Sequence, residues 1–149
     1  MTSIEGMDNL QRAIRAMPET ARQGAEKGMQ RATLRVQRTA RQKAPVDTGR
    51  LRASIARVVQ QIVSGVRGIV GSVVKYAPFR EFKTRPHFVP RRFIGTWAQR
   101  HGFGDTGLFV SGRATPFLRP AFEENLQAAI GDIRKGVIDE LEAMGRRFR

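Results

Sequence analysis

Residues 44–55, Ala-Pro-Val-Asp-Thr-Gly-Arg-Leu-Arg-Ala-Ser-Ile, divide the 149-residue chain into a helical part and a part rich in β-branched residues. Ala44-Pro45 predicts the end of a helix, because the residue before a proline avoids the α region. Asp47, Thr48 and Gly49 predict a turn, since Asp binds local backbone N–H groups and Gly accepts a positive φ. The stretch therefore indicates a fold that joins helices to strands.

A long helix is predicted before this stretch, over Glu19–Lys43, and a shorter one over Ile4–Ala16, with Pro18 breaking the chain between them. The long helix has a narrow apolar stripe that is mostly Ala, so a neighbouring element can pack very close to it. The stripe consists of Ala21, Ala25, Met29, Ala32, Val36 and Ala40. The opposite face is basic and has few acidic partners at i±4. It carries Lys27, Arg31, Arg35, Arg38 and Arg41.

Two strands are predicted after the turn, at Ile55–Val63 and Val66–Val74, with Ser64-Gly65 as the turn of a hairpin. Gly68 and Gly71 in the second strand indicate a bulge or a close approach of another group. The hairpin is expected to form a small antiparallel sheet.

A long insertion follows a short helical turn predicted at residues 76–82. Over residues 83–113 six basic residues oppose one acidic residue. Ile94–Arg100 predicts one or two helical turns, and Leu108–Val110 predicts a short strand. An ordered segment of this length is usually functional.

A long C-terminal helix is predicted next, with Thr115-Pro116 as its start and Pro120 near its first turn. One apolar stripe runs along it, formed by Phe122, Leu126, Ala129, Ile130, Ile133, Val137, Leu141 and Met144. We therefore expect an α+β fold in which long N- and C-terminal helices pack on a small antiparallel β-sheet, with a long irregular insertion. We expect a single domain over 1–149. Its first part, 1–43, is helical, and 44–84 contains a turn, a β-hairpin and a short helix. A basic, aromatic-rich insertion follows over 85–113, and the C-terminal helix occupies 114–149.

Composition narrows the class of function. The chain has 27 Lys and Arg against 13 Asp and Glu, a formal net charge of +14, which points to a polyanion or an acidic protein surface as partner. The absence of cysteine excludes disulfides and thiol chemistry. No apolar run approaches the length that spans a bilayer, and the N-terminus lacks the apolar block of a secretory signal.

Catalytic and metal sites are not expected. His87 and His101 are the two histidines, and neither has a second ligand at metal-binding spacing. Asp-Thr-Gly occurs at 47–49 and at 105–107, but the flanking residues do not match those of an aspartic protease. The sequence therefore predicts no enzyme, no cofactor and no metal.

Nucleic-acid binding is the remaining chemical candidate. In the insertion, cations for phosphates alternate with rings for stacking, which is typical of single-strand binding: Arg85, Phe88, Arg91, Arg92, Phe93, Trp97 and Arg100. The aromatic residues could equally form a small core within the insertion. No helix-turn-helix, zinc-finger or RNA-recognition signature is present.

Three blocks, at residues 44–55, 76–84 and 114–122, resemble in order the motifs of tail-completion and head–tail joining proteins of long-tailed bacteriophages and prophages. Lys83 stands where these proteins usually have glycine, so the turn into the insertion is expected to differ. The matching positions, which we expect to be structural, are Pro45, Asp47, Thr48, Gly49, Leu51, Tyr76, Ala77, Glu81, Thr84, Pro116, Phe117 and Pro120. Tyr76 and Phe82 are expected to anchor the insertion on the core.

The resemblance implies a non-enzymatic virion protein without cofactors, assembled in the host cytoplasm and located in the phage neck. It further implies a homo-oligomeric ring with six-fold symmetry or a multiple of it. The expected partners of this ring are neck and tail-tube proteins, with non-specific contact to packaged DNA as an option. No contact with a membrane is expected. The residues expected to face a partner or DNA are Arg31, Arg35, Arg38, Arg85, Arg91, Arg92, Trp97 and Arg100. The alternative is a free basic protein that binds nucleic acid without sequence specificity.

Overall fold

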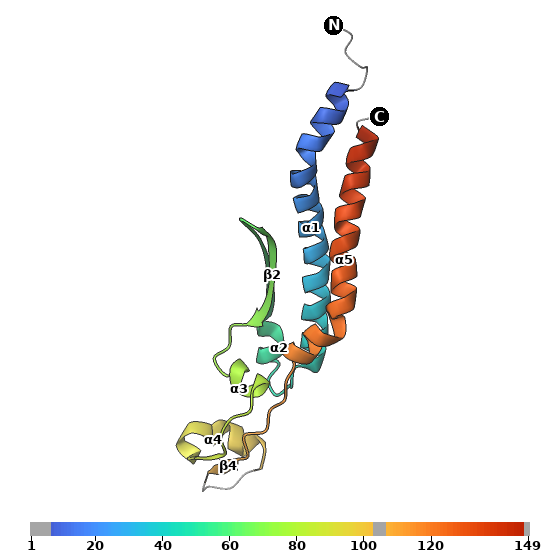
Figure 1. Cartoon of the computed structure of the whole chain (residues 1–149). Coiled ribbons are helices and arrows are strands. Elements are labelled where there is room, and N and C mark those ends of the chain that lie inside the picture. The colour runs from blue at the N-terminus through green and yellow to red at the C-terminus, as the bar shows by residue number, and fades with distance from the viewer. Residues whose placement is uncertain (1–6, 103–106, 148–149) are drawn as a thin grey trace.

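Two long antiparallel helices form the body of the molecule. The computed structural model describes residues 7–102 and 107–147, with side chains from residue 11 onward. Helix α1 spans Met7–Lys43 and α5 spans Leu118–Arg147, and the two lie side by side over most of their length (Figure 1). At about 1.5 Å per residue they are roughly 55 and 45 Å long. The molecule is therefore elongated.

The shorter elements connect the C-terminal end of α1 to the start of α5. In chain order they are α2 (Arg50–Ser54), β1 (Ile55–Ile62), β2 (Gly65–Ser72), α3 (Ala77–Glu81), β3 (His87–Val89), α4 (Arg91–Arg100) and β4 (Leu108–Val110). β1 and β2 form one antiparallel hairpin, and β3 pairs antiparallel with β4 in a second two-stranded sheet. These elements confirm the predicted α+β fold of long helices and a small antiparallel sheet.

The predicted break at Pro18 is wrong, because Pro18 lies inside the continuous helix α1. A proline removes one N–H from the helix but leaves the neighbouring turns intact. The side chain of Thr20, two residues later, donates to the carbonyl of Ala16 at 3.0 Å and contacts the sulfur of Met144 on α5 at 3.4 Å. Packing against α5 thus holds the helix together at this point.

The hairpin differs in detail from its prediction. Its two-residue turn is Val63-Ser64, because Ile62 pairs with Gly65, which has a φ of 148°. The register runs without a bulge from Ile55↔Ser72 to Ile62↔Gly65. The single helical turn of α2 before the first strand was not predicted.

The insertion and the last helix also begin differently from the prediction. α4 starts at Arg91 rather than Ile94, and the residues before it form strand β3, so the insertion contains regular elements. The short strand at Leu108–Val110 is confirmed. α5 starts at Leu118 rather than at Thr115-Pro116, which places Pro120 in its first turn as predicted.

Glycines let α1 and α5 approach closely. A Cβ built on Gly24 would lie 2.6 Å from the carbonyl oxygen of Gly136, and one built on Gly28 would lie 2.6 Å from that of Asp132. Real Cβ atoms essentially never come within 3.0 Å of another heavy atom of this kind, so a side chain at either position would force the helices apart. The close approach expected from the small-residue face of α1 is therefore confirmed, and the glycines beside the Ala stripe make it possible.

The hairpin packs on another face of α1. A Cβ on Gly68 would lie 2.5 Å from Cγ2 of Thr33, so the predicted close approach is confirmed at Gly68, whereas Gly71 has open space beside it. The carbonyl of Ile55 accepts hydrogen bonds from the side chains of Gln37 and Arg41, each at 2.8 Å. These bonds attach the start of β1 to α1.

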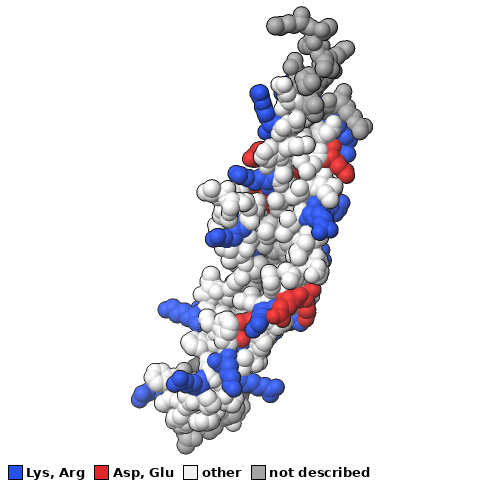
Figure 2. All heavy atoms as spheres, in the orientation of Figure 1, with Lys and Arg blue, Asp and Glu red and all other residues white. Residues whose placement is uncertain are grey.

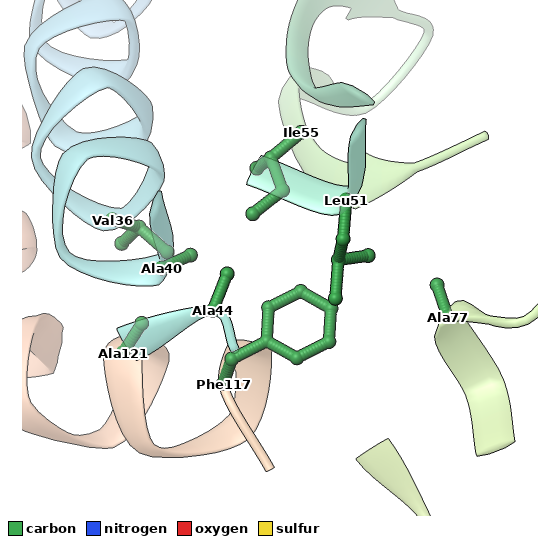
Figure 3. Packing of buried hydrophobic residues seen from close by; sticks show 8 residues of the cluster. All are labelled: Val36, Ala40, Ala44, Leu51, Ile55, Ala77, Phe117 and Ala121. Atoms are coloured by element: carbon green, nitrogen blue, oxygen red, sulfur yellow. The ribbon is translucent and has the colours of Figure 1, made fainter. Parts of the chain in front are cut away.

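A small core lies where the three sequence blocks meet. Its buried members are Val36, Ala40, Ala44, Leu51, Ile55, Ala77, Phe117 and Ala121. Figure 3 shows the ring of Phe117 beside Leu51 and Ala44. Phe117 and Ile55 are the largest fully buried side chains. Each of the blocks 44–55, 76–84 and 114–122 therefore contributes to the same core.

The substitution Gly28→Ala tests the close helix contact. Alanine favours helix by about 1 kcal/mol over glycine, but its Cβ has no room against the α5 backbone. We expect a net loss of about 1–3 kcal/mol in the free energy of unfolding, measured by urea denaturation. Gly131→Ala on α5 is the control, because a Cβ there meets nothing within 4 Å and should stabilise. Equal effects of the two substitutions would contradict the close contact.

Candidate functional site

The Glu81 carboxylate holds the start of α5. Glu81 ends α3 and is 9% exposed. Its oxygens accept backbone hydrogen bonds from Phe117 at 2.9 Å, from Leu118 at 2.9 Å and from Arg119 at 2.7 Å. These N–H groups belong to the first turn of a helix, where no carbonyl of the helix itself can accept them. A negative charge there also interacts favourably with the helix dipole.

Glu81 and its neighbour Ala77 take the anchoring role that was predicted for Tyr76 and Phe82. Tyr76 is 40% exposed and Phe82 is 65% exposed, so their predicted role as anchors on the core is wrong. Ala77 is buried in the core instead. Sequence reasoning missed the cap because Glu81 and Phe117 are far apart in the chain, and no local pattern connects them.

The two ends of the insertion meet at a hydrogen-bonded stem. The N–H of Thr84 donates to the carbonyl of Gly112 at 3.1 Å, and the N–H of Thr115 donates to that of Arg80 at 2.8 Å. Gly112 has a φ of 71°, and it packs directly on Thr84. Lys83 has no positive φ, since among the described residues only glycines adopt one. The positive φ needed at this stem therefore comes from Gly112.

The other motif positions differ in how deeply they are buried. Gly49 has a φ of 77°, as predicted for the turn, and Leu51 is buried. Asp47 is exposed and its carboxylate lies 3.6 Å from the His101 ring at the end of α4. The remaining positions are exposed or half-buried: Pro45, Thr48, Pro116 and Pro120.

The insertion forms a basic, aromatic end of the molecule. Figure 2 shows Lys and Arg side chains projecting from the end where α4 and β4 lie in Figure 1. Arg92 lies over the ring of Phe93, 4.8 Å from its centroid. Trp97 is half-buried and stacks on His101 with ring centroids 4.4 Å apart. The rings of Phe88, Phe93 and Phe109 are mostly exposed.

The predicted partner-facing cations fall into two groups. On α1, Arg35 makes a bidentate ion pair with Asp132 of α5, and Arg31 donates to the Asp132 carbonyl. Both therefore hold the two helices together, and their role toward a partner stays a prediction. Arg38 is exposed, as are the insertion residues Arg85, Arg92 and Arg100, whereas Arg91 is half-buried.

An apolar groove of about 930 Å³ runs between the hairpin and α5. Its floor is α1, one wall is β2 and the other is α5, while α3 closes one end. The α5 wall consists of Leu118, Arg119, Phe122, Leu126, Ala129, Ile130 and Ile133. Much of the apolar stripe predicted on α5 thus faces this groove, and Phe122, Leu126 and Ile130 are 38–53% exposed.

The isolated chain exposes more surface than a compact protein of its mass. Its accessible surface is 11051 Å², whereas a compact monomer of 16.7 kDa exposes about 7,600 Å². The excess includes the groove and the aromatic rings of the insertion. Exposed apolar patches of this kind mark interaction sites.

The described residues give no sign of a membrane span or a metal site. None of the described helices combines the length and the apolar character needed to cross a bilayer. Within the same residues, no group of three or more His, Cys, Asp or Glu lies close enough together to hold a metal ion.

The sequence matches a family of phage tail proteins. The family model described as "Bacteriophage HK97-gp10, putative tail-component" matches residues 8–82, just over half of the chain. The chain belongs to this HK97-gp10-like family of bacteriophage tail components. The matched part comprises α1, α2, the hairpin and α3. Comparisons with curated proteins and with solved structures gave no significant match.

Substitution of Glu81 tests the cap on α5. Glu81→Ala leaves three backbone N–H groups without their acceptor, so we expect the free energy of unfolding to fall by about 3 kcal/mol. Glu81→Gln keeps one acceptor oxygen and should lose about half as much. Denaturation in urea, followed by circular dichroism, measures both.

Glu123→Ala is the matched control. Glu123 lies in the same first turns of α5, but it is exposed and pairs with Arg119. An exposed pair of this type contributes less than about 1 kcal/mol. If Glu81→Ala cost no more than Glu123→Ala, the carboxylate would not be holding α5.

Proposed function

We propose that the protein is a non-enzymatic structural protein of the phage neck that joins or completes the tail at the head–tail interface. In this proposal it acts as a homo-oligomeric ring of six copies or a multiple of six. It is assembled in the host cytoplasm and remains in the virion. Its neighbours in the ring, the neck proteins and the tail-tube protein are the partners.

The large exposed apolar surface of the single chain is the observation that carries the proposal. A stable body with an open groove and exposed aromatic rings is suited to function inside an assembly, where neighbours cover those surfaces. Membership in a family of tail components supports the same conclusion. The described residues contain a closely packed helical pair that can fix geometry.

The basic insertion supports a position beside acidic surfaces. Positive charges on adjacent copies of a ring would repel one another, so an acidic neighbour or the packaged DNA must offset them. Arg85, Arg92 and Arg100 are exposed and lie on the same insertion. We propose that they face such a neighbour. The alternative of a free nucleic-acid-binding protein relies on these same cations, and membership of a tail-component family favours the virion role.

Removal of the gene from the phage or prophage that encodes the protein tests the proposal. We expect cells to accumulate filled heads and separate tails, visible by electron microscopy, with few joined particles. Mass spectrometry of purified wild-type particles should detect the protein. Expression of the wild-type gene in trans should restore joining.

A control variant with a substitution outside the core accompanies this experiment. Expression of Glu123→Ala in trans should also restore joined particles, because that exposed position is outside the core. Normal, infectious particles in the absence of the gene would contradict the structural role. That outcome would instead favour the free nucleic-acid-binding protein.

A further inference from the structure

The groove beside α5 has the features of an unfilled interface. Its α5 wall carries Phe122, Leu126 and Ile130, which are spaced one helical turn apart and remain partly exposed. Its floor carries Met29, Ala32 and Val36 of α1. A continuous apolar surface of this length, open along one side, accommodates an apolar segment of a partner.

One face of β2 forms the hairpin wall of the groove. Gly68, Val70 and Ser72 line it, and alternate residues of a strand lie on the same face. Gly71 also lines the groove, but it has no side chain to direct to either face. Among the described strands, β2 pairs only with β1. The outer edge of β2 therefore also offers unpaired N–H and C=O groups to another chain.

The insertion carries three aromatic rings that are largely exposed in the described part of the chain. Phe88 of β3 lies directly opposite Phe109 of β4, so both rings project from the same face of their small sheet. They are 55% and 66% exposed, and Phe93 on α4 is 70% exposed. We call these three residues the aromatic face.

We propose that the groove of one copy receives the aromatic face of a second copy of this chain. The inference rests on the proposed function, in which the protein works as a homo-oligomer. It adds the contact itself: Phe88, Phe93 and Phe109 pack against Phe122, Leu126 and Ile130 of the neighbour.

The available area agrees with a contact of this kind. A buried aromatic side chain covers about 150–250 Å², so the three partly exposed rings offer about 400 Å². A stable interface needs about 800 Å² per partner. The rings would therefore supply about half of the insertion side, and exposed neighbours on the insertion such as Arg85 and Arg92 can supply the remainder.

Charge favours the same pairing. Residues 83–113, which form the insertion, carry 6 basic side chains and 1 acidic one, whereas residues 121–149 carry 5 basic and 6 acidic ones. α5 is thus the part of the chain without an excess of positive charge, and Figure 2 shows acidic atoms gathered near its start. A basic insertion meets less repulsion there than against any other part of a second copy.

The two surfaces are different, so the contact joins copies head to tail. A contact between unlike surfaces leaves one groove and one aromatic face free on every growing assembly, and it closes into a ring when the rotation between successive copies completes a full turn. A contact between like surfaces would stop at a dimer. The proposed contact therefore accounts for a ring without a second type of interface.

Sedimentation velocity of the full chain tests the contact. Ile130→Glu alters the groove and Phe109→Glu alters the aromatic face. Each should raise the dissociation constant of self-association at least about 30-fold, as expected for a residue at the centre of an interface. Ile138→Glu and Phe79→Glu are matched controls, because these residues are similarly exposed but do not line the groove or belong to the aromatic face. The controls should assemble like the wild type.

Mixing the two defective variants gives the sharpest result. Ile130→Glu retains its aromatic face and Phe109→Glu retains its groove, so an equimolar mixture should form dimers and nothing larger. Each variant alone should stay monomeric. Far-UV circular dichroism checks folding, and Leu126→Glu with Phe93→Glu forms a second pair if either variant is unfolded.

Four outcomes would overturn the inference. One is a mixture that stays monomeric while the wild type assembles. Another is equal loss of assembly in the controls. The third is a wild-type protein that remains monomeric. The fourth is an Ile130→Glu variant that assembles normally but is no longer incorporated into particles, since another virion protein would then occupy the groove. In the third and fourth cases the virion role, tested by gene removal, still stands.

Discussion

The bond between the Glu81 carboxylate and the first turn of α5 is the constraint on which the rest of the structure depends. It fixes where α5 begins, because three backbone N–H groups converge on one buried side chain. It also places Phe117 in the core formed with Leu51 and Ile55. The end of the hairpin segment and the start of the last helix are thereby joined, although the insertion separates them in the chain.

The open groove is a consequence of that arrangement. Once its start is fixed, α5 runs back along α1 and packs closely at Gly24, Gly28 and Gly136. The hairpin packs on a different face of α1 through Gly68. Because α5 and the hairpin pack on different faces of α1, an apolar groove stays open between them. The same geometry that makes the helical pair rigid therefore leaves a surface for a neighbour.

Local patterns predicted the local elements well. Pro45 and Gly49 marked the end of α1 and the turn after it, and β-branched residues marked the hairpin. The prediction was wrong at Pro18, where tertiary packing overrides a local helix breaker. The resemblance to tail proteins was confirmed by the family match, which covers the first block and the second as far as residue 82.

Long-range features were beyond the reach of the sequence patterns. The partner of Glu81 is 36 residues away, and no periodicity connects the two. The stripe on α5 was recognised, but helical spacing cannot show that Phe122 and Ile130 face a groove rather than a core. Likewise, Arg35 was recognised as part of a basic stripe, while its ion pair with Asp132 depends on the antiparallel placement of α5.

A reconstruction of the assembled particle at side-chain resolution tests the central claim most directly. The claim is that the single chain is an incomplete body whose groove is filled by a neighbouring copy. The account predicts density from the β3–β4 sheet of the adjacent copy between β2 and α5, with the rings of Phe88 and Phe109 against Ile130. A groove that is open to solvent in the assembled particle would contradict it.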